Sequence, residues 1–371
     1  MKIFLSLVFT LSLFQIHKSY SQGNPPWERP LKIATSNDGT TFSNFAIFQD
    51  SSGVPSAVKW HGDTLICAFQ WFRLPQNSVT WDKVAVKYSY DGGINWTQPV
   101  PIIINNLPVN FQRPFDPTLA VINNDSIRIY YSSSNGMPVG GLDSSINTYS
   151  AVSTDGINYQ FEINPRFDHS TNRVIDPAVI HFNGIWHYSA PIGAPQDGAF
   201  YCTSNDGINF IQQNNILSTF NRNWTGNFLV NDTNELRFYG SGQQVWFNTS
   251  MDGNTWQSYI NTNIVGGDPT VVKVNTGNYL AIFVGEPYTV GINENYLPDF
   301  TVSPNPFTDN ICLKGKPGEK YSYKIYSSQG LVLQTGNSYA NESIYTGVLV
   351  NGFYVLLIET NNLTTQYKIV K

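Results

Sequence analysis

Short apolar stretches separated by polar turns follow one another along most of this 371-residue chain. In each repeating unit, a first strand begins near a proline, and a tight turn rich in Asn, Asp and Gly leads to a second apolar strand. A variable loop, a third strand, a glycine turn and a fourth strand complete the unit. The expected second strands are residues 64–70, 126–132, 185–190, 235–240 and 279–284. This pattern predicts an all-β protein made of antiparallel hairpins in series.

A turn of the form Ser-x-Asp-Gly, closed by an aromatic residue, occurs five times between these strands. The copies are Ser36–Phe42, Ser89–Trp96, Ser153–Tyr159, Ser204–Phe210 and Ser250–Trp256. The carboxylate can accept hydrogen bonds from nearby backbone N–H groups, the glycine supplies a positive φ, and the aromatic ring enters an apolar layer. The copies begin 53, 64, 51 and 46 residues apart, which leaves room for four strands per repeat.

These repeated turns resemble the Asp-box, or BNR repeat, of sialidases and other secreted β-propellers. Five copies at regular spacing indicate the fold much more strongly than they indicate an activity. The resemblance implies that the aspartates of the turns are structural.

The first strands and the repeated turns are equal in number but out of phase. The last unit, at 266–286, has a first and a second strand without a turn of its own, and the N-terminal segment has a turn with its flanking strands, 31–35 and 42–48. A ring accounts for both incomplete units, because the N-terminal strands can complete the last one. The sequence therefore predicts a five-bladed β-propeller over residues 27–292 that is closed by strands from both ends.

Alternating strand directions assign the two faces of such a ring. The repeated turns share one face with the turns between first and second strands. The loops that enter each first strand, and those that follow each second strand, lie on the opposite face. These loops are the longest and most varied, so we expect a binding site there, over the central axis.

The amino-acid composition limits the kinds of molecule that this protein is expected to bind. Aromatic residues make up 14% of the chain and charged residues only 13%, which suits an extracellular all-β protein with a polar, weakly charged surface. The net charge of −5 provides no basic field, so we expect no nucleic-acid partner. The three cysteines, Cys67, Cys202 and Cys312, have no zinc-site spacing, and we expect neither a metal nor another cofactor.

The two ends of the chain carry export signals. Lys2 and the apolar run 3–16, followed by Ser19-Tyr-Ser21, predict a signal peptide over 1–21, and no other stretch predicts a transmembrane segment. We assign 22–295 to the propeller. The tail, 298–371, has the pattern of a small antiparallel β-sandwich.

The tail also has three sequence features that place it in a family. It opens with Pro304-Asn-Pro306-Phe307, contains Gly352-Phe-Tyr, and ends with Lys368-Ile-Val-Lys371. It is similar to the C-terminal sorting domain of type IX secretion cargo. The similarity implies the type IX secretion machinery as a partner and a secreted or cell-surface location.

Candidate chemistry lies at three of the first-strand entrances, where an aspartate precedes the proline: Asp116, Asp176 and Asp268. We expect the proline to hold each aspartate in an extended conformation. In a ring, these entrances converge near the axis, so three carboxylates can share one pocket beside Arg113 and Arg173. Such a cluster would shift pKa values and suit acid–base chemistry or recognition of sugar hydroxyls.

Here the chain resembles five-bladed glycoside hydrolases such as the family 43 arabinanases and xylosidases. That resemblance implies a base Asp in blade one, a pKa-tuning Asp in blade three and an acid Glu in blade four. Asp176-Pro177 matches the third blade. Val54-Pro55 carries no carboxylate, and Trp224-Thr-Gly226 replaces the expected Glu. A hydrolase would then take its acid from elsewhere. Glu286 is our candidate, and Glu162, Asp168 and Asp197 are alternatives.

Aromatic and basic residues near the same loops could stack on or hydrogen-bond to sugar rings. We select Trp71, Arg73, Trp224 and His187 as candidates. Three hypotheses for an extracellular glycan partner remain open: a divergent glycoside hydrolase that uses Asp116, Asp176, Asp268 and Glu286, a non-catalytic glycan- or surface-binding propeller, and an adhesion protein that binds other proteins.

Overall fold

The computed structural model describes residues 29–73, 81–136, 145–192, 198–232, 234–275, 277–286, 300–327, 330–360 and 364–371. These residues form strands, turns and bends without a helix, which confirms the prediction of an all-β protein. Membrane-spanning helices are therefore absent from these ranges. The expected signal peptide, 1–21, lies outside them. The chain divides into two compact units, Met1–Pro287 and Tyr288–Lys371, and each is described by itself.

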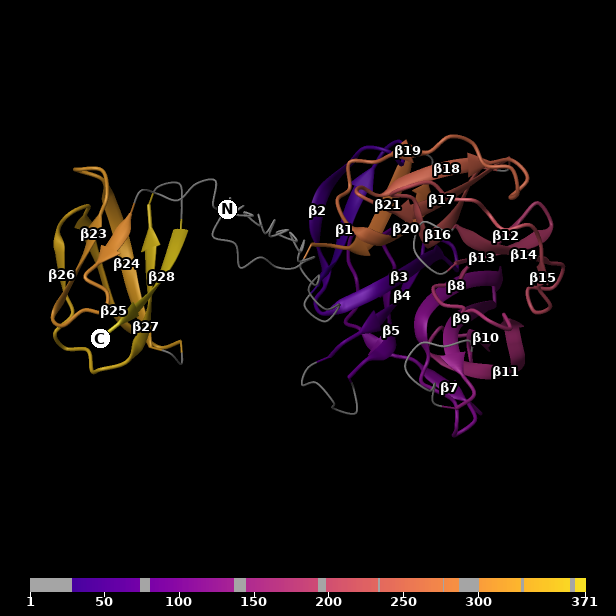
Figure 1. Ribbon diagram of the computed structural model, residues 1–371, viewed down its shortest axis with the longest axis horizontal. Helices are drawn as coiled ribbons and strands as arrows, with labels where there is room; N and C mark the ends of the chain where they lie inside the picture. The colour runs from indigo at the N-terminus through magenta and orange to yellow at the C-terminus, as the bar shows by residue number, and fades with distance from the viewer. Residues whose placement is uncertain are drawn as a thin grey trace, which may run out of the picture. The chain divides into compact units, whose positions relative to one another are not determined.

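The first unit contains five separate sheets (Figure 1). Sheet 1 has the strand order β3 (Ser52–Lys59), β4 (Leu65–Trp71), β5 (Lys83–Ser89), β6 (Val100–Pro101). Sheet 2 has the order β7 (Ile103–Asn105), β11 (Asn158–Phe167), β10 (Ile146–Ser153), β9 (Ser126–Ser134), β8 (Phe115–Asn123). Sheet 3 has the order β12 (Ala178–Phe182), β13 (Ile185–Pro191), β14 (Ala199–Ser204), β15 (Ile211–Gln212). Sheet 4 has the order β16 (Asn223–Asp232), β17 (Glu235–Ser241), β18 (Trp246–Ser250), β19 (Ile260–Asn261).

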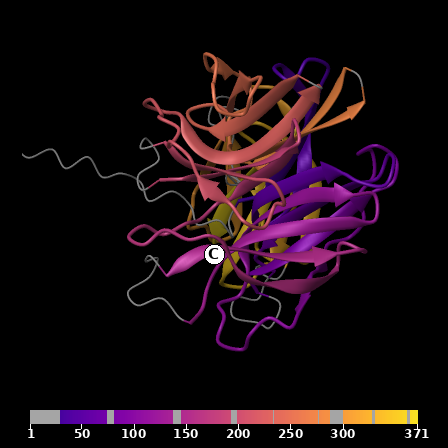
Figure 2. The same cartoon turned by 90° about the vertical axis from the view of Figure 1, so that its right-hand side faces the viewer.

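Sheet 5 joins strands from the two ends of this unit. Its order is β2 (Phe42–Gln49), β1 (Leu31–Ser36), β21 (Asn278–Val284), β20 (Gly267–Asn275). β1 and β21 pair antiparallel without a break in register, from Leu31 opposite Val284 to Ser36 opposite Tyr279. In Figures 1 and 2 these indigo and orange strands lie together. The N-terminal segment thus belongs to the sheet of the strands that are last in this unit.

The first strands of the five sheets contact one another in a cyclic order. β3 contacts β8, β8 contacts β12, β12 contacts β16, β16 contacts β20, and β20 contacts β3. The apolar clusters lie between neighbouring sheets, as with Ile66 and Ile129 between sheets 1 and 2, or Phe228 and Tyr201 between sheets 4 and 3. Because these side chains fill the spaces between sheets, removal of one sheet would expose apolar surface on two others.

Polar side chains link the first strands where they meet. Asn227 of β16 donates from Nδ2 to the carbonyl of Pro55 in β3 (3.1 Å) and accepts at Oδ1 from the Thr118 hydroxyl in β8 (3.2 Å). The Ser56 hydroxyl accepts the Leu119 N–H (2.9 Å). Since buried polar groups are costly without partners, these bonds fix the relative positions of sheets 1, 2 and 4.

The repeated turns are held by their own aspartates and packed against the next sheet. In four turns one carboxylate oxygen accepts two successive backbone N–H groups at 2.6–2.8 Å. The carbonyl of Gly207 in sheet 3 accepts the Tyr130 hydroxyl of sheet 2 (2.8 Å), and that of Gly39 in sheet 5 accepts the Tyr239 hydroxyl of sheet 4 (2.9 Å). The turns therefore connect sheets as well as strands.

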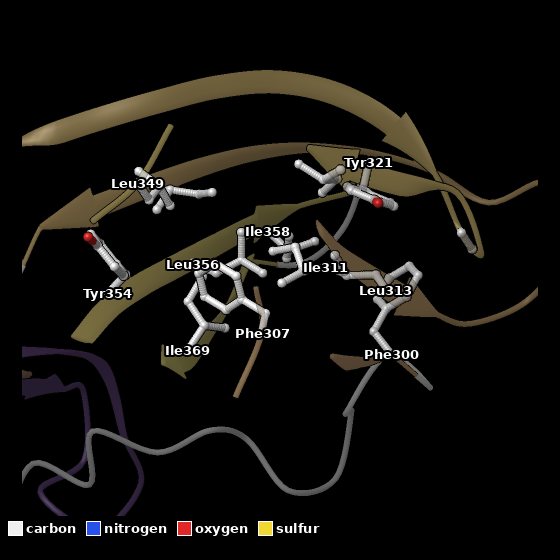
Figure 3. Packing of buried hydrophobic residues seen from close by; sticks show 13 residues of the cluster. Phe300, Phe307, Ile311, Leu313, Tyr321, Leu349, Tyr354, Leu356, Ile358 and Ile369 are labelled. Carbon is white, nitrogen blue, oxygen red and sulfur yellow. The ribbon is translucent and has the colours of Figure 1, made fainter. Parts of the chain in front are cut away.

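The second unit has two antiparallel sheets. One has the order β22 (Thr301–Ser303), β23 (Asn310–Lys314), β26 (Ser343–Tyr345). The other has the order β25 (Val332–Tyr339), β24 (Lys320–Ser327), β27 (Phe353–Glu359), β28 (Thr364–Val370). Figure 3 shows Ile311 of one sheet and Leu356, Ile358 and Ile369 of the other pointing toward one another, together with Phe307 from the connection between β22 and β23. These side chains form a separate apolar core for the unit.

One glycine of a repeated turn provides a test of this packing. Gly253 has a φ of +79°, and a Cβ atom there would overlap the ring of His187 in sheet 3. Gly184 has a φ of +78° and no atom near such a Cβ. Both Gly→Ala changes carry the same backbone strain, but only Gly253→Ala adds overpacking, which costs about 1–3 kcal/mol.

We therefore expect Gly253→Ala to lower the free energy of unfolding by about 1–3 kcal/mol more than Gly184→Ala. The measurement is urea unfolding followed by tryptophan fluorescence, which reports on the first unit alone because all nine tryptophans precede residue 257. Equal losses in the two variants would contradict the packing of this turn against sheet 3.

Candidate functional site

Three aspartates stand at equivalent first-strand entrances in an unusual backbone conformation. φ is +50° at Asp116, +51° at Asp176 and +44° at Asp268, and Val54 at the same place in sheet 1 has +46°. The expectation of an extended conformation before the proline was therefore wrong. The pairing register shifts at these points in sheets 1, 2 and 5, as at a β-bulge. A bulge turns a side chain out of the regular alternation, and left-handed φ in non-glycine residues is strained.

The three aspartates, two of them at bulges, line the wall of one pocket of about 560 Å³. Each of the three is half-buried. The other charged residues of the wall are Asp82, Arg29 and Arg113. The rest of the lining is largely apolar, with two glutamines: Gly53, Val54, Gln70, Phe72, Gln112, Phe115, Ile175 and Val284. Four of the five sheets contribute to this pocket.

Direct contacts connect the acidic residues. The N–H of Asp176 points at Oδ2 of Asp116 (3.4 Å). Oε1 of Gln70 accepts the N–H of Asp116 (3.3 Å), and Nε2 of Gln70 donates to Asp82. Asp82 also forms an ion pair with Arg113. Gln70 therefore links the Asp82–Arg113 pair to the backbone that carries Asp116.

Burial raises the pKa of all three entrance aspartates. It raises the pKa of Asp116 to about 7, and the charge of Asp268 adds to the rise, while the Asp176 N–H, Ser132 and Arg113 oppose it. Burial and the charges of Asp116 and Asp268 raise the pKa of Asp176 well above its ordinary value. Neighbouring carboxyls in a low-dielectric site cannot all ionise, so the cluster retains protons near neutral pH.

Asp268 differs from the other two in its hydrogen-bond donors. Burial raises its pKa as well, but the side chains of Thr225 and Ser241 and the charge of Arg29 lower it. The backbone N–H of Asp268 also donates to the Ser241 hydroxyl (2.8 Å). Donors aimed at a carboxylate favour its ionised form. Asp268 is therefore better suited than Asp176 to carry the negative charge of the cluster.

A much smaller cavity of about 10 Å³ shares Asp176 and Asp268 with this pocket and is also lined by Thr118 and Asn227. Its volume is about that of one water molecule. Within the part of the chain that the structure describes, no group of three His, Cys, Asp or Glu side chains could hold a metal ion.

The structure brings together four of the predicted site residues: Arg113, Asp116, Asp176 and Asp268. Arg173 does not line the pocket, although its charge lowers the pKa of Asp176. Glu286 is exposed just beyond β21 and does not line it either. The proposal of Glu286 as the acid therefore has no support from its position.

Trp71 and Arg73 were expected at the pocket but lie outside its lining. Gln70 and Phe72 line it instead. Side chains alternate along an extended chain, so Trp71 and Arg73 belong to the other side, where the Arg73 guanidinium stacks on the Trp71 ring at 5.2 Å. The prediction was wrong by one position.

Trp224 and His187 are core residues, and their selection as ligand-binding residues was wrong. Trp224 is 1% exposed and packs on Phe238 and Trp246. His187 is 2% exposed, and its Nδ1 is bonded to the Tyr201 hydroxyl (2.8 Å). Their rings fill the spaces between sheets, where no ligand can reach them.

Asp82, Gln70 and Arg29 are pocket residues that the sequence analysis missed. Asp82 follows a variable loop and belongs to no repeat, so no pattern marked it. Gln70 could have been found from strand alternation, since its side chain points to the side opposite to that of Trp71. Arg29 precedes the first strand, and only the addition of β1 to sheet 5 brings it to the pocket.

Comparison with known sequences characterises the second unit. Residues 301–371 match the family described as a secretion system C-terminal sorting domain. This match supports export to the cell surface or the surroundings and implies recognition by the type IX secretion machinery. Among curated proteins, no sequence match is found.

Solved structures with a similar course of the chain include glycoside hydrolases. An α-L-arabinofuranosidase from Clostridium thermocellum has a TM-score of 0.48 at 14% identity, over 78% of this chain and 94% of its own. An α-L-arabinanase from Penicillium chrysogenum has 0.43 at 15%, over 67% and 84%. A sialidase from Trypanosoma rangeli has 0.39 at 11%, over 90% and 87%. Likeness of this degree does not define an activity.

The raised pKa of Asp116 makes stability depend on pH. An unfolded aspartate loses its proton near pH 4, whereas folded Asp116 keeps it up to about pH 7. The folded state binds more protons between these values, so its stability falls as pH rises through this window. We expect the stability of the wild type, measured relative to that of Asp116→Asn, to fall by about 3 kcal/mol from pH 4 to pH 7.

The measurement is urea unfolding of both proteins at several pH values, followed by tryptophan fluorescence. Asp125→Asn, in the exposed β8–β9 turn, is the control and should follow the wild type. Parallel curves for the wild type and Asp116→Asn would show that Asp116 ionises at an ordinary pH.

Proposed function

We propose that the first unit is a five-bladed β-propeller whose blades are sheets 1 to 5, the last completed by β1 and β2. The cyclic contacts of the first strands and the pairing of β1 with β21 support this. The pocket then opens on the face where the chain enters the first strands, above the axis of the ring.

We further propose that this propeller binds extracellular carbohydrate in the pocket and hydrolyses a glycosidic bond. One observation carries the proposal: Asp116, Asp176 and Asp268 come from three sheets and share one pocket. Hydrolysis of glycosides needs a protonated carboxyl and an ionised one on either side of the bond. The walls formed by Phe72, Phe115 and Val284 offer apolar surface to the C–H faces of a sugar.

The electrostatics suggest roles for the three aspartates. Asp116, with a pKa of about 7, would be the acid that gives its proton to the leaving glycosidic oxygen. Asp268, stabilised as an anion by Thr225, Ser241 and Arg29, would take a proton from the attacking water, whose oxygen bonds to the sugar carbon as the C–O bond breaks. Asp176 would act as a positioning residue, because its N–H points at Asp116.

Binding without hydrolysis is the second candidate function. Val54 and Thr225 occupy the other two entrances, so sheets 1 and 4 contribute no carboxyl to the cluster. A glycan-binding or adhesive propeller would need only the hydroxyl recognition that the remaining carboxyls and glutamines provide. The sorting domain at 301–371 supports an extracellular target in either case.

The test is a screen of the purified chain against a glycan array and a panel of chromogenic glycosides. We expect hydrolysis of at least one neutral or amino-sugar glycoside, and a loss of kcat of about 10²–10⁴-fold in Asp116→Asn, since this is what an acid in such a step contributes. Asp268→Asn should lose activity to a similar extent while binding persists.

Asp125→Asn is the control and should retain full activity. Full turnover by Asp116→Asn would contradict the role assigned to that residue. Retention on the array without turnover of any glycoside would favour the binding function. The absence of both retention and turnover would refute the carbohydrate proposal.

A further inference from the structure

The charges of the pocket define which ligands it can accept. Among the residues that the structure describes, four carboxyl groups and two guanidinium groups line it, and no lysine or histidine does. Of the guanidinium groups, that of Arg113 is paired with Asp82, which is itself buried. Arginine binds an anionic sugar through a bidentate pair with its carboxylate. Here Asp82 already occupies Arg113, and an incoming carboxylate would also face three aspartates.

A ligand with an ammonium group is attracted by the same carboxyl groups that repel an anionic sugar. Asp116, Asp176 and Asp268 all have a left-handed φ and line the same pocket, and Asp116 and Asp268 also stand at β-bulges, so their carboxyls are crowded together. Protons relieve the repulsion between them in the empty pocket, because burial and like charges favour the neutral carboxyls. An ammonium group placed among them can replace such a proton without a change in the total charge of the pocket, and it gains charge-assisted hydrogen bonds.

We propose that this pocket selects sugars that bear a free, protonated amine and that it binds them in exchange for a proton. The inference rests on the proposed carbohydrate function and names its substrate class. Hexosamines with an unsubstituted amino group are preferred, neutral hexoses bind more weakly, and uronic acids bind most weakly. The hydroxyl groups of the sugar contact the same glutamines and carboxyls in all three cases, so the amine decides the order.

The position of the amine follows from the contacts of the wall. Asp82 is bonded to both Gln70 and Arg113, and these three residues form a neutral side. Asp116 and Asp176, which are joined through the Asp176 N–H, form the acidic side. An ammonium group therefore belongs beside Asp116 and Asp176, with the sugar ring directed toward Phe72 and Phe115.

The experiment is isothermal titration calorimetry of the full chain at pH 6 with three matched sugars: glucosamine, glucose and glucuronate, and the same set for galactose and mannose. At this pH Asp116, with a pKa of about 7, is still largely protonated. We expect at least one hexosamine to bind ten-fold or more tightly than its neutral counterpart. Titrations in two buffers of different ionisation enthalpy should show release of about one proton per hexosamine bound, and none for the neutral sugar.

Two variants connect the effect to the pocket. Asp116→Asn should abolish both the proton release and the preference for the amine, while weak binding of the neutral sugar persists. Asp125→Asn, in the exposed turn at the opposite end of β8 from Asp116, should behave as the wild type. Circular dichroism and tryptophan fluorescence check that both variants are folded.

The outcomes separate this inference from the proposed function. Neutral sugars that bind as well as hexosamines, without proton release, would overturn the amine preference and leave carbohydrate binding in place. Tightest binding of a uronic acid would overturn it more directly. If no sugar of any class binds, both the inference and the carbohydrate function are refuted.

Discussion

The pairing of β1 with β21 is the contact on which the arrangement of the first unit depends. It joins residues about 250 positions apart, and the entropy of closing such a loop grows only with the logarithm of its length. The pairing covers strand edges that would otherwise be open to other chains. It also completes the sheet that carries Asp268 and brings Arg29 to the same pocket. Without it, the acids of sheets 2 and 3 would lack the third member of their cluster.

The packing between the sheets offsets the backbone strain at the first-strand entrances. Left-handed φ at Val54, Asp116, Asp176 and Asp268 costs of order 1–3 kcal/mol at each residue, and the crowding of buried carboxyls adds to the cost. Apolar side chains packed between all neighbouring sheets and the bonds of Asn227 to β3 and β8 offset it. Because the surrounding contacts come from four sheets, no single strand can relax to relieve the strain.

The sequence predicted the periodic features well and the irregular ones poorly. The repeated turns and prolines marked the strands, and Asp-Pro marked three of the four acids of the pocket. Asp82 follows a loop without a pattern and could not be found. Trp224 and His187 were misjudged because strands packed on both faces bury aromatic rings that look available in a sequence. Trp71 and Arg73 were misplaced because one residue of register decides which side chain reaches a pocket.

The first-strand entrance of sheet 4, one of the two without an acid, explains why the three carboxyls are not equivalent. Asn227 lies opposite Tyr239 as Thr118 lies opposite Tyr130, so Thr225 corresponds to Asp116. Its hydroxyl bonds to Ser241 (2.9 Å), and both side chains lower the pKa of Asp268. A fourth carboxyl at this place would have raised that pKa through like-charge repulsion. The absence of an acid at this entrance thus favours the ionised form of Asp268 beside Asp116 and Asp176, which retain protons. Acid–base chemistry requires one ionised and one protonated group.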